Sequence, residues 1–353
     1  MKAIYLDNNA TTRLDPMVLE AMMPFMTEHY GNPSSIHGFG EPVRKALEAA
    51  RHQVATLLGA EHDSEIVFTS CATEANSTVL LSAVEALPDR KQIITTVVEH
   101  PAILEVCEHL ERQGYQIHRL AVDGQGRLDL DAYAALLSDQ VALVSVMWAN
   151  NETGTLFPVL EMAQMAKAHG ILFHTDGVQA VGKLPINLAT SAIDLLSFSG
   201  HKLHGPKGVG ALYVRRGTRF RPLLRGGHQE RGRRAGTENS AGIIGSPAGV
   251  LPGMTGGPKR PIRSSASRRN ISCSRADWLS RLAAALPPAG CAATPADWAA
   301  GRLASSACCR ASKALFDRLA GCSRAVAGLS GEVTIAGCAV SIPARSRKSF
   351  NSA

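Results

Sequence analysis

The stretch "IDLLSFSGHKLHGPKG", residues 193–208, joins a short apolar run to a loop rich in glycine and basic side chains. Its first part predicts a buried strand. The twelve residues from Ser197 onward contain two histidines, two lysines and three glycines. Because ligands in α/β sheets lie outside the carboxyl ends of the strands, this stretch predicts a ligand site that includes Lys202.

The segments before this stretch alternate between strand and helix patterns. "QIITTVVEH" (92–100) predicts a buried strand, and "PAILEVCEHLERQG" (101–114) predicts a helix with proline at its start and glycine after its end. The pattern continues with "VALVSVMWANNETG" (141–154) as strand and loop, "VLEMAQMAKAHG" (159–170) as helix, "ILFHTDGVQAVG" (171–182) as strand and polar turn, and "GVGALYVRRG" (208–217) as a last strand. This alternation predicts an α/β fold with a mostly parallel sheet and helices on both faces.

Polar side chains follow four of the predicted strands. They are Glu99-His100, Asn150-Asn151-Glu152, His174-Thr175-Asp176 with Gln179, and Ser199-Gly200-His201-Lys202. A fifth strand, in "IVFTSCATEANS" (66–77), runs into a helix start, where free backbone N–H groups and the helix dipole favour an anion. The strand ends together supply a phosphate site, a carboxylate, an imidazole and a lysine.

A lysine amine, a carboxylate and an anion site are the groups that pyridoxal phosphate requires. Lys202 suits the bond to the cofactor aldehyde, and Asp176 suits the role of keeping the pyridine nitrogen protonated. Each residue also has a purely structural interpretation. A lysine in a glycine-rich loop is typically solvated, a lone histidine beside a strand (His100) is usually structural, Asp176 suits an Asx turn and Thr73 a helix N-cap.

Eight segments in order resemble the cysteine desulfurases, and among them the NifS type that serves nitrogenase maturation. They are "YLDNNATTRLDP" (5–16), "YGNPSSIHGFG" (30–40), "TSCATEANS" (69–77), "VEHPAILE" (98–105), "NNETGTLFPV" (150–159), "HTDGVQAVGKLPINL" (174–188), "SFSGHKLHGPKGVGALYVRRG" (197–217) and "GGHQERGRRAGTEN" (226–239). The resemblance covers residues 1–245. It implies the fold of type I pyridoxal-phosphate-dependent transferases, with a mostly parallel seven-stranded sheet in a large domain and a smaller C-terminal α+β domain.

The resemblance also implies a role for each matching residue. Lys202 is expected to bind the cofactor and move the α-proton of the substrate, His100 to stack on the pyridine ring, and Asp176 to pair with its nitrogen. Asn151 and Gln179 are expected near the phenolic oxygen. The residues expected to hold the phosphate, or to lie beside it, are Ala72, Thr73, Ser199, Gly200 and His201, with Thr237 reaching the phosphate of the neighbouring subunit in a homodimer.

In this family a cysteine thiolate of the enzyme attacks the sulfur of L-cysteine. The resemblance therefore implies an enzyme persulfide, L-alanine as product, and an iron–sulfur scaffold protein as the sulfur acceptor. The S-S-G-S-A-C loop expected to hold this thiol, and an arginine expected to bind the substrate carboxylate, have no clear match in the sequence. Cys322 and Cys308, in "GCSRAV" (321–326) and "ASSACCRAS" (304–312), are the candidates that remain.

The composition changes abruptly near residue 245. Residues 1–245 contain 22 lysines and arginines against 26 acidic residues, whereas residues 246–353 contain 15 against 4 and six of the eight cysteines. We therefore expect an N-terminal segment (1–15), a large domain (16–245) and a divergent C-terminal region (246–353). The excess of Ala, Arg, Gly, Pro, Ser and Cys after 245 suggests translation of a GC-rich gene in a shifted frame, a hypothesis that resequencing would test.

Composition and spacing also bear on other classes of function. We expect a cytoplasmic protein, because the chain has no apolar leader and no uncharged apolar stretch of about 18 residues. The C-terminal region contains no C-x-x-C pair, so no metal site is predicted. Two alternatives to the desulfurase stay open: a selenocysteine lyase or aminotransferase with the same fold, and an inactive protein whose arginine-rich tail binds nucleic acid or an acidic partner. The nucleic-acid interpretation ranks last, because the tail has few aromatic side chains to stack on bases.

Overall fold

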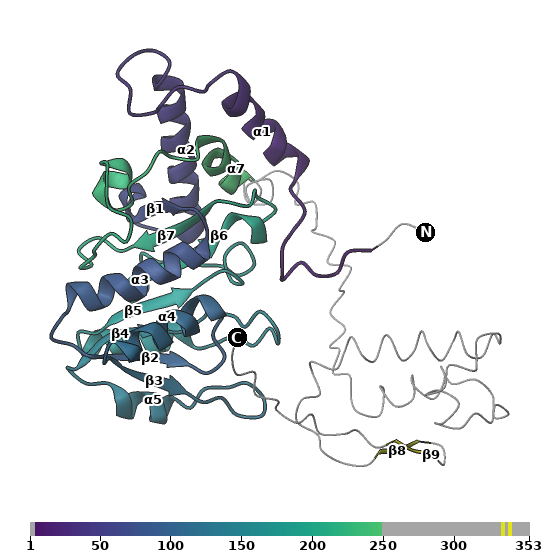
Figure 1. Cartoon of the computed structure of the whole chain (residues 1–353), viewed down its shortest axis with the longest axis vertical. Coiled ribbons are helices and arrows are strands. Elements are labelled where there is room, and N and C mark those ends of the chain that lie inside the picture. Colours follow the sequence, from purple (N-terminus) through teal and green to yellow (C-terminus); the bar gives the residue numbers. More distant parts are fainter. Residues whose placement is uncertain (1–3, 249–332, 336–337, 341–353) are drawn as a thin grey trace, which may run out of the picture. The chain divides into compact units, whose positions relative to one another are not determined.

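A sheet of seven strands organises the fold, in the order β1-β7-β6-β5-β4-β2-β3 (Figure 1). The computed structural model describes residues 4–248, 333–335 and 338–340. The strands of the sheet are β1 (Ile66–Thr69), β2 (Gln92–Thr96), β3 (Gln116–Leu120), β4 (Val141–Ser145), β5 (Leu172–Asp176), β6 (Leu195–Ser199) and β7 (Gly210–Val214). Helices separate most of them: α1 (Pro16–Thr27), α2 (Glu41–Leu58), α3 (Ala72–Ala86), α4 (Pro101–Arg112), α5 (Leu130–Leu136), α6 (Val159–Ala168) and α7 (Ser240–Ala248), with short 3-10 turns η1 (Asp63–Glu65), η2 (Gly200–Lys202) and η3 (Gln229–Gly232).

Most neighbouring strands run parallel, which confirms the predicted mostly parallel sheet. The pairs β3–β2, β2–β4, β4–β5 and β5–β6 are parallel, whereas β7 is antiparallel to both β6 and β1. Since β1 is antiparallel to β7, it runs in the same direction as β6. The carboxyl ends of β1, β2, β4, β5 and β6 therefore lie at the same edge of the sheet.

Helices cover both faces of the sheet. Neighbouring residues in each strand point to opposite faces, so each strand contributes apolar side chains to both. Val67, Ile93 and Leu143 pack with apolar residues of α3 and α4 in one core cluster. Phe68 and Ile94 pack on the other face with residues of α2, α5 and α6. Two separate hydrophobic layers thus hold the strands in register.

The predicted ends of several elements are confirmed, but two strands are shorter than expected. The strand predicted over 208–217 spans Gly210–Val214. α4 begins at Pro101, and Gly114 follows it with φ +90°, as the proline and glycine signals predict. The strand expected over 92–100 ends at Thr96. Its Oγ1 accepts a 3.3 Å hydrogen bond from the amide of Val98, in a turn that leads to His100. Because valine has a high strand propensity, the residue pattern did not indicate this turn.

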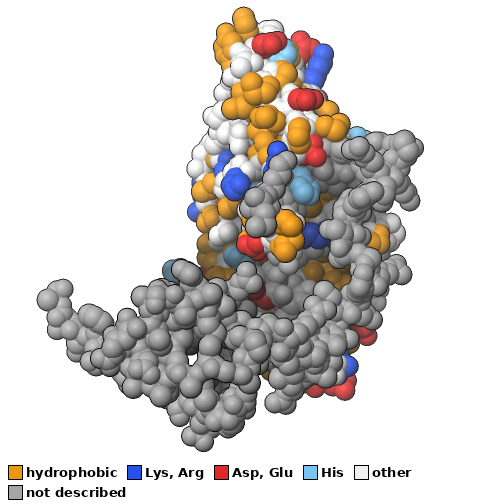
Figure 2. Space-filling model, turned by 90° about the vertical axis from the view of Figure 1, so that its right-hand side faces the viewer, with side chains coloured by type: hydrophobic (Ala, Val, Ile, Leu, Met, Phe, Trp, Pro, Cys, Tyr) orange, Lys and Arg blue, Asp and Glu red, His pale blue; other side chains and the backbone are white. Residues whose placement is uncertain are grey.

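Residues 4–248 leave a group of large apolar side chains exposed around α1. Met17, Leu19, Met23 and Met26 are exposed on the helix, and Tyr30, Ile36 and Phe39 in the loop that follows it. Figure 2 shows hydrophobic side chains gathered at the top of the molecule, where Figure 1 places α1 and this loop. An apolar surface of this kind typically marks an interface.

The chain divides into two compact units, residues 1–263 and 264–353. In the second unit the structure describes a two-stranded antiparallel pair, β8 (Val333–Ile335) and β9 (Cys338–Val340). The predicted division into residues 1–15, 16–245 and 246–353 stays a prediction, and most of the expected C-terminal α+β domain lies outside the described residues. Within the described residues, no helix combines the length and the apolar character that a membrane span requires.

Candidate active site

The polar strand ends surround one pocket of about 520 Å³ at the carboxyl edge of the sheet. The pocket lies where a parallel sheet is expected to hold a ligand. Ten of the residues singled out in the sequence line it: Ala72, Thr73, His100, Asn151, Glu152, Asp176, Gln179, Ser199, His201 and Lys202. The fold therefore brings together groups that lie up to 130 positions apart in the chain.

Asp176, at the end of β5, is 6% exposed and has both carboxylate oxygens engaged. Oδ1 accepts a 3.0 Å hydrogen bond from the amide of Val178, and Oδ2 accepts a 2.7 Å bond from Nδ2 of Asn76. Burial raises the pKa of Asp176, although both hydrogen bonds and the nearby cationic side chains oppose that shift. The Asx-turn interpretation and the pocket interpretation of this residue are thus compatible.

Lys202 lies in η2, directly after β6, and is half-buried in the pocket wall. Its Nζ donates hydrogen bonds to the backbone carbonyls of Asn9 and, at 2.9 Å, Ala10. Burial lowers the pKa of Lys202, while the negative charge of Asp176 acts in the opposite direction. A lowered pKa makes the neutral, nucleophilic amine more available near neutral pH.

An N-terminal segment around Asn9 closes part of the pocket. The Asn9 side chain donates a 3.1 Å bond to the carbonyl of Asn151, and its own carbonyl accepts a 3.0 Å bond from Nε2 of Gln179. Thr12 Oγ1 donates a 2.8 Å bond to the carbonyl of His201. The sequence identified this segment only as part of a motif. Its contacts with the pocket were not predictable, because its hydrogen bonds join residues more than 140 positions apart.

The N-terminus of α3 forms the anion-compatible end of the pocket. Cys71 is the N-cap, and Ala72 and Thr73 in the first turn line the pocket. Ser199 lines the same pocket and is 3% exposed, and within residues 4–248 its Oγ has no hydrogen-bond partner. A helix N-terminus beside a buried, unpartnered hydroxyl is suited to bind an anion.

His100 is the N-cap residue of α4 and follows the turn at Val98. Its Nδ1 accepts a 3.1 Å hydrogen bond from the amide of Ala102. Glu99 beside it is buried, and its Oε1 accepts bonds from Thr96 Oγ1 at 2.9 Å and from the amide of Met147 at 3.0 Å. Burial raises the pKa of Glu99 to about 8, and the charge of Asp176 acts in the same direction. Glu99 thus links the start of α4 to the end of β4.

The remaining predicted site residues lie elsewhere. Gly200 follows Ser199 but does not line the pocket, and Thr237 lines a separate hollow of about 100 Å³ together with Ser70 and Arg234. The candidate thiols Cys308 and Cys322 lie outside the described residues.

Asn76 is the main residue that sequence reasoning missed. It is 1% exposed and lines the pocket from α3, one turn beyond Thr73. The spacing of three residues in "TEAN" places both side chains on the same face of the helix, and this spacing was the available signal.

Residues 4–248 contain two thiols, Cys71 and Cys107, which differ in burial. Cys71 lines the pocket, whereas Cys107 is fully buried and burial raises its pKa to about 12. A thiol with such a pKa is not a nucleophile at neutral pH. Among the described residues no group of three or more His, Cys, Asp or Glu side chains is arranged to bind a metal ion.

Comparison with known proteins identifies relatives of this chain. The aminotransferase class-V family matches residues 4–251. The cysteine desulfurase NifS of Azotobacter vinelandii is 67% identical over 245 residues, which are 69% of this chain and 61% of that protein. A cysteine desulfurase of Klebsiella pneumoniae is 65% identical over 261 residues, 72% of this chain and 65% of that protein. The chain thus spans slightly more than three fifths of the length of these curated relatives.

Solved structures give the same grouping. A structure described as a NifS-like protein is 45% identical, with a TM-score of 0.69 over 70% of this chain and 69% of that chain. A structure of SspA in complex with cysteine is 37% identical, with a TM-score of 0.68 over 70% of this chain and 72% of that chain. The chain belongs to the aminotransferase class-V family and, within it, to the NifS-like proteins.

Proposed function

We propose that the chain contains the cofactor-binding part of a pyridoxal-phosphate-dependent cysteine desulfurase. The observation that supports this best is that Lys202 and Asp176 line the same pocket as Ala72 and Thr73 at the N-terminus of α3. Relatives with 60–69% identity are named cysteine desulfurase. The reaction would convert L-cysteine to L-alanine and leave the sulfur on the enzyme as a persulfide.

The residues of the pocket fit pyridoxal phosphate. Ser199 Oγ is a buried hydroxyl without a partner among residues 4–248, and it lies at the same pocket as the free N–H groups of α3. These groups suit a phosphate. Asp176 is a buried carboxylate that suits a protonated ring nitrogen, and Lys202 supplies the amine. Ala72, Thr73 and His201 would complete the phosphate site.

The bound cofactor would hold the amino acid through its aldehyde carbon and draw electrons from Cα into its ring. Lys202 would attach the cofactor and then remove and return the proton at Cα. Asp176 would keep a proton on the ring nitrogen, and His100 would stack on the ring. Gln179 and Asn151 would donate hydrogen bonds near the phenolic oxygen.

We further propose that the protein is a homodimer in which Thr237 reaches the phosphate of the neighbouring subunit. Two observations support an assembly. Thr237 does not line the pocket of its own chain, and large apolar side chains are exposed around α1. An interface that covers such a surface would remove apolar area from water.

The thiol that receives the sulfur is proposed to lie in the C-terminal region, with Cys322 and Cys308 as candidates. Cys107 is unsuited, because it is fully buried and its pKa is raised to about 12. An iron–sulfur scaffold protein of the cytoplasm is the proposed acceptor, and the NifS name of a relative with 67% identity favours nitrogenase maturation as the pathway served.

The test is to incubate the full-length chain with pyridoxal phosphate, L-cysteine and excess dithiothreitol, which reduces the persulfide and releases its outer sulfur as sulfide, and to measure sulfide and alanine. The proposal predicts equal amounts of both products and none from Lys202→Ala. Product only from L-selenocysteine would indicate a selenocysteine lyase. Amino-group transfer that depends on a keto acid, without sulfide, would indicate an aminotransferase, and either result would overturn the proposal.

A further inference from the structure

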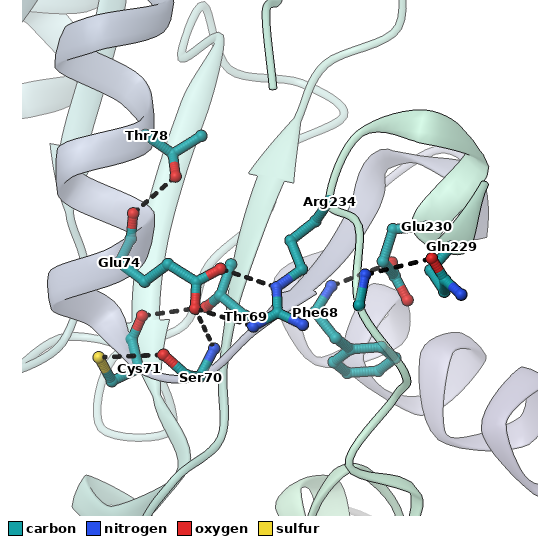
Figure 3. Close-up of polar contacts among 10 residues, drawn as sticks. Phe68, Thr69, Ser70, Cys71, Glu74, Thr78, Gln229, Glu230 and Arg234 are labelled. Atoms are coloured by element: carbon teal, nitrogen blue, oxygen red, sulfur yellow. Dashed lines mark hydrogen bonds and ion pairs between the residues drawn. The ribbon is translucent and has the colours of Figure 1, made fainter. Parts of the chain in front are cut away.

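The first turn of α3 contains a carboxylate at the end of the helix that faces the pocket. Glu74 Oε2 accepts a 2.8 Å hydrogen bond from the amide of Ser70, which precedes the N-cap Cys71 (Figure 3). Thr69 Oγ1 donates a 3.0 Å bond to the carbonyl of Cys71 and braces the same turn. Glu74 thus shapes the turn that leads into Ala72 and Thr73.

Arg234 binds this carboxylate through two nitrogen atoms. Its Nε lies 2.9 Å from Oε1 of Glu74 and its Nη2 lies 3.2 Å from Oε2 (Figure 3). The side chains are only 22% and 11% exposed, so water screens the pair weakly. Against the effect of burial, the contacts with Arg234 and Ser70 hold the pKa of Glu74 below its usual range, and the hydrogen bond to Glu74 raises the pKa of Arg234.

The pocket itself has few positive charges with which to bind a phosphate. Among the described residues that line it are three acids, Asp7, Glu152 and Asp176, but no arginine, and Lys202 is its one lysine. The affinity for an anion therefore depends strongly on the N-terminus of α3. An unpaired Glu74 carboxylate in the first turn of that helix would repel the same anion.

We propose that Arg234 is a positioning residue for the cofactor phosphate, because it neutralises Glu74 and so preserves the positive potential at the N-terminus of α3. This inference rests on the proposed function, since it takes the pocket to hold pyridoxal phosphate. Arg234 belongs to the same segment as Thr237, and both line the small hollow beside Ser70. The pair therefore also joins the phosphate end of the pocket to the segment that would reach the partner subunit.

The alternative is that the pair only anchors the 226–239 segment. The two interpretations predict different effects of the two single substitutions on the affinity for pyridoxal phosphate. If charge matters, Arg234→Gln leaves an unpaired carboxylate and weakens phosphate binding, whereas Glu74→Gln leaves an unpaired guanidinium and does not weaken it. If the pair is only an anchor, both substitutions break the same contact and act in the same direction.

The experiment measures the apparent dissociation constants of pyridoxal phosphate and of pyridoxal, which lacks the phosphate, with the full-length apoprotein. We expect Arg234→Gln to weaken pyridoxal phosphate about tenfold, from Coulomb repulsion at an effective dielectric constant of about 20. Pyridoxal should bind unchanged. Glu74→Gln should bind pyridoxal phosphate at least as tightly as the unsubstituted chain, and the double substitution should return the affinity to within about threefold of it.

Arg234→Lys and Arg225→Gln serve as controls. Arg234→Lys keeps the charge and should retain the affinity. Arg225 pairs with Glu85 at the other end of α3, with Nη2 2.6 Å from Oε1, so Arg225→Gln makes the same charge change away from the pocket and should have no effect.

Two results would overturn the inference: equal weakening of pyridoxal and pyridoxal phosphate by Arg234→Gln, or a double substitution as weak as Arg234→Gln. A failure of the unsubstituted chain to bind pyridoxal phosphate would instead contradict the proposed function.

Discussion

Asn76 of α3 donates a 2.7 Å hydrogen bond to Oδ2 of Asp176 at the end of β5, 100 positions away in the chain. Both residues line the pocket. Both side chains are at least 94% buried, so the bond is made in a low-dielectric environment. It opposes the effect of burial on Asp176, whose pKa would rise further without it. Asn76 therefore helps to keep charged the carboxylate that the proposed chemistry requires.

We predict that Asn76→Ala lowers the proposed desulfurase activity about tenfold, since a hydrogen bond to a charged group contributes about 1.5–3 kcal/mol. The pH dependence should change as well, because the activity should be lost at a higher pH as Asp176 becomes protonated more readily. The measurement is a pH–activity profile of both proteins. An acidic limb that does not move would show that Asn76 has no influence on Asp176.

Glu99 predicts a specific pH dependence of stability. Its pKa is raised from 4.5 to about 8 by burial, so the folded chain holds a proton that the unfolded chain has released. The stability from this group is complete below about pH 4.5 and is lost as the pH rises towards about 8, at about 1.4 kcal/mol per pH unit. Urea unfolding of the apoprotein between about pH 5 and about pH 8 measures the slope. Glu99→Gln should remove the contribution of one proton from the slope of the free energy of unfolding against pH. An unchanged slope would contradict the raised pKa of Glu99.

His174 lies between two serines on neighbouring strands inside the sheet. Its Nδ1 is 2.8 Å from Ser145 Oγ and its Nε2 is 2.9 Å from Ser197 Oγ. Burial lowers the pKa of His174 to about 3, so the imidazole is neutral. We predict that His174→Leu destabilises the fold by about 2–4 kcal/mol, because two buried hydroxyls lose a partner.

A matched triple variant separates this cause from a simple packing defect. Ser145→Ala and Ser197→Ala added to His174→Leu remove both orphaned hydroxyls, so part of the stability should return in urea unfolding. No recovery would indicate that lost packing, and not the missing hydrogen bonds, causes the defect.

Arg51 of α2 and Glu230 form a further ion pair, which anchors η3 to that helix. The contacts are 2.7 Å and 2.8 Å, and Oε2 of Glu230 also accepts a 3.1 Å bond from the amide of Phe68. The Glu230 side chain is 2% exposed, and its φ of +48° is in the left-handed region. We predict that Arg51→Met costs about 3–5 kcal/mol, because it leaves an unpaired buried charge.

The exposed pair Arg127–Asp123 is the control for this prediction. It has a similar N–O distance, 2.9 Å, but its side chains are 67% and 43% exposed. Arg127→Met should change the free energy of unfolding by less than about 1 kcal/mol. Equal effects of the two substitutions would show that burial does not set the strength of the Arg51 pair.

The sequence predicted the parts of the fold that depend on local pattern. Apolar runs and the Pro101 and Gly114 signals located strands and α4, and the rule for strand ends located pocket residues such as His100, Asp176 and Lys202. Non-local contacts were not predictable in the same way. The antiparallel direction of β7 and the hydrogen bonds of Asn9 depend on pairing between distant segments, which no local pattern encodes. Glu74 and Arg234, 160 positions apart, are a further case.

The proposal that Lys202 binds pyridoxal phosphate is tested by locating the covalent bond between the chain and the cofactor. The full-length protein is incubated with pyridoxal phosphate, reduced with borohydride, digested and examined by mass spectrometry. We expect the label on Lys202, which lines the pocket and whose pKa is lowered by burial. A label on another lysine, or no label on a folded chain, would contradict it.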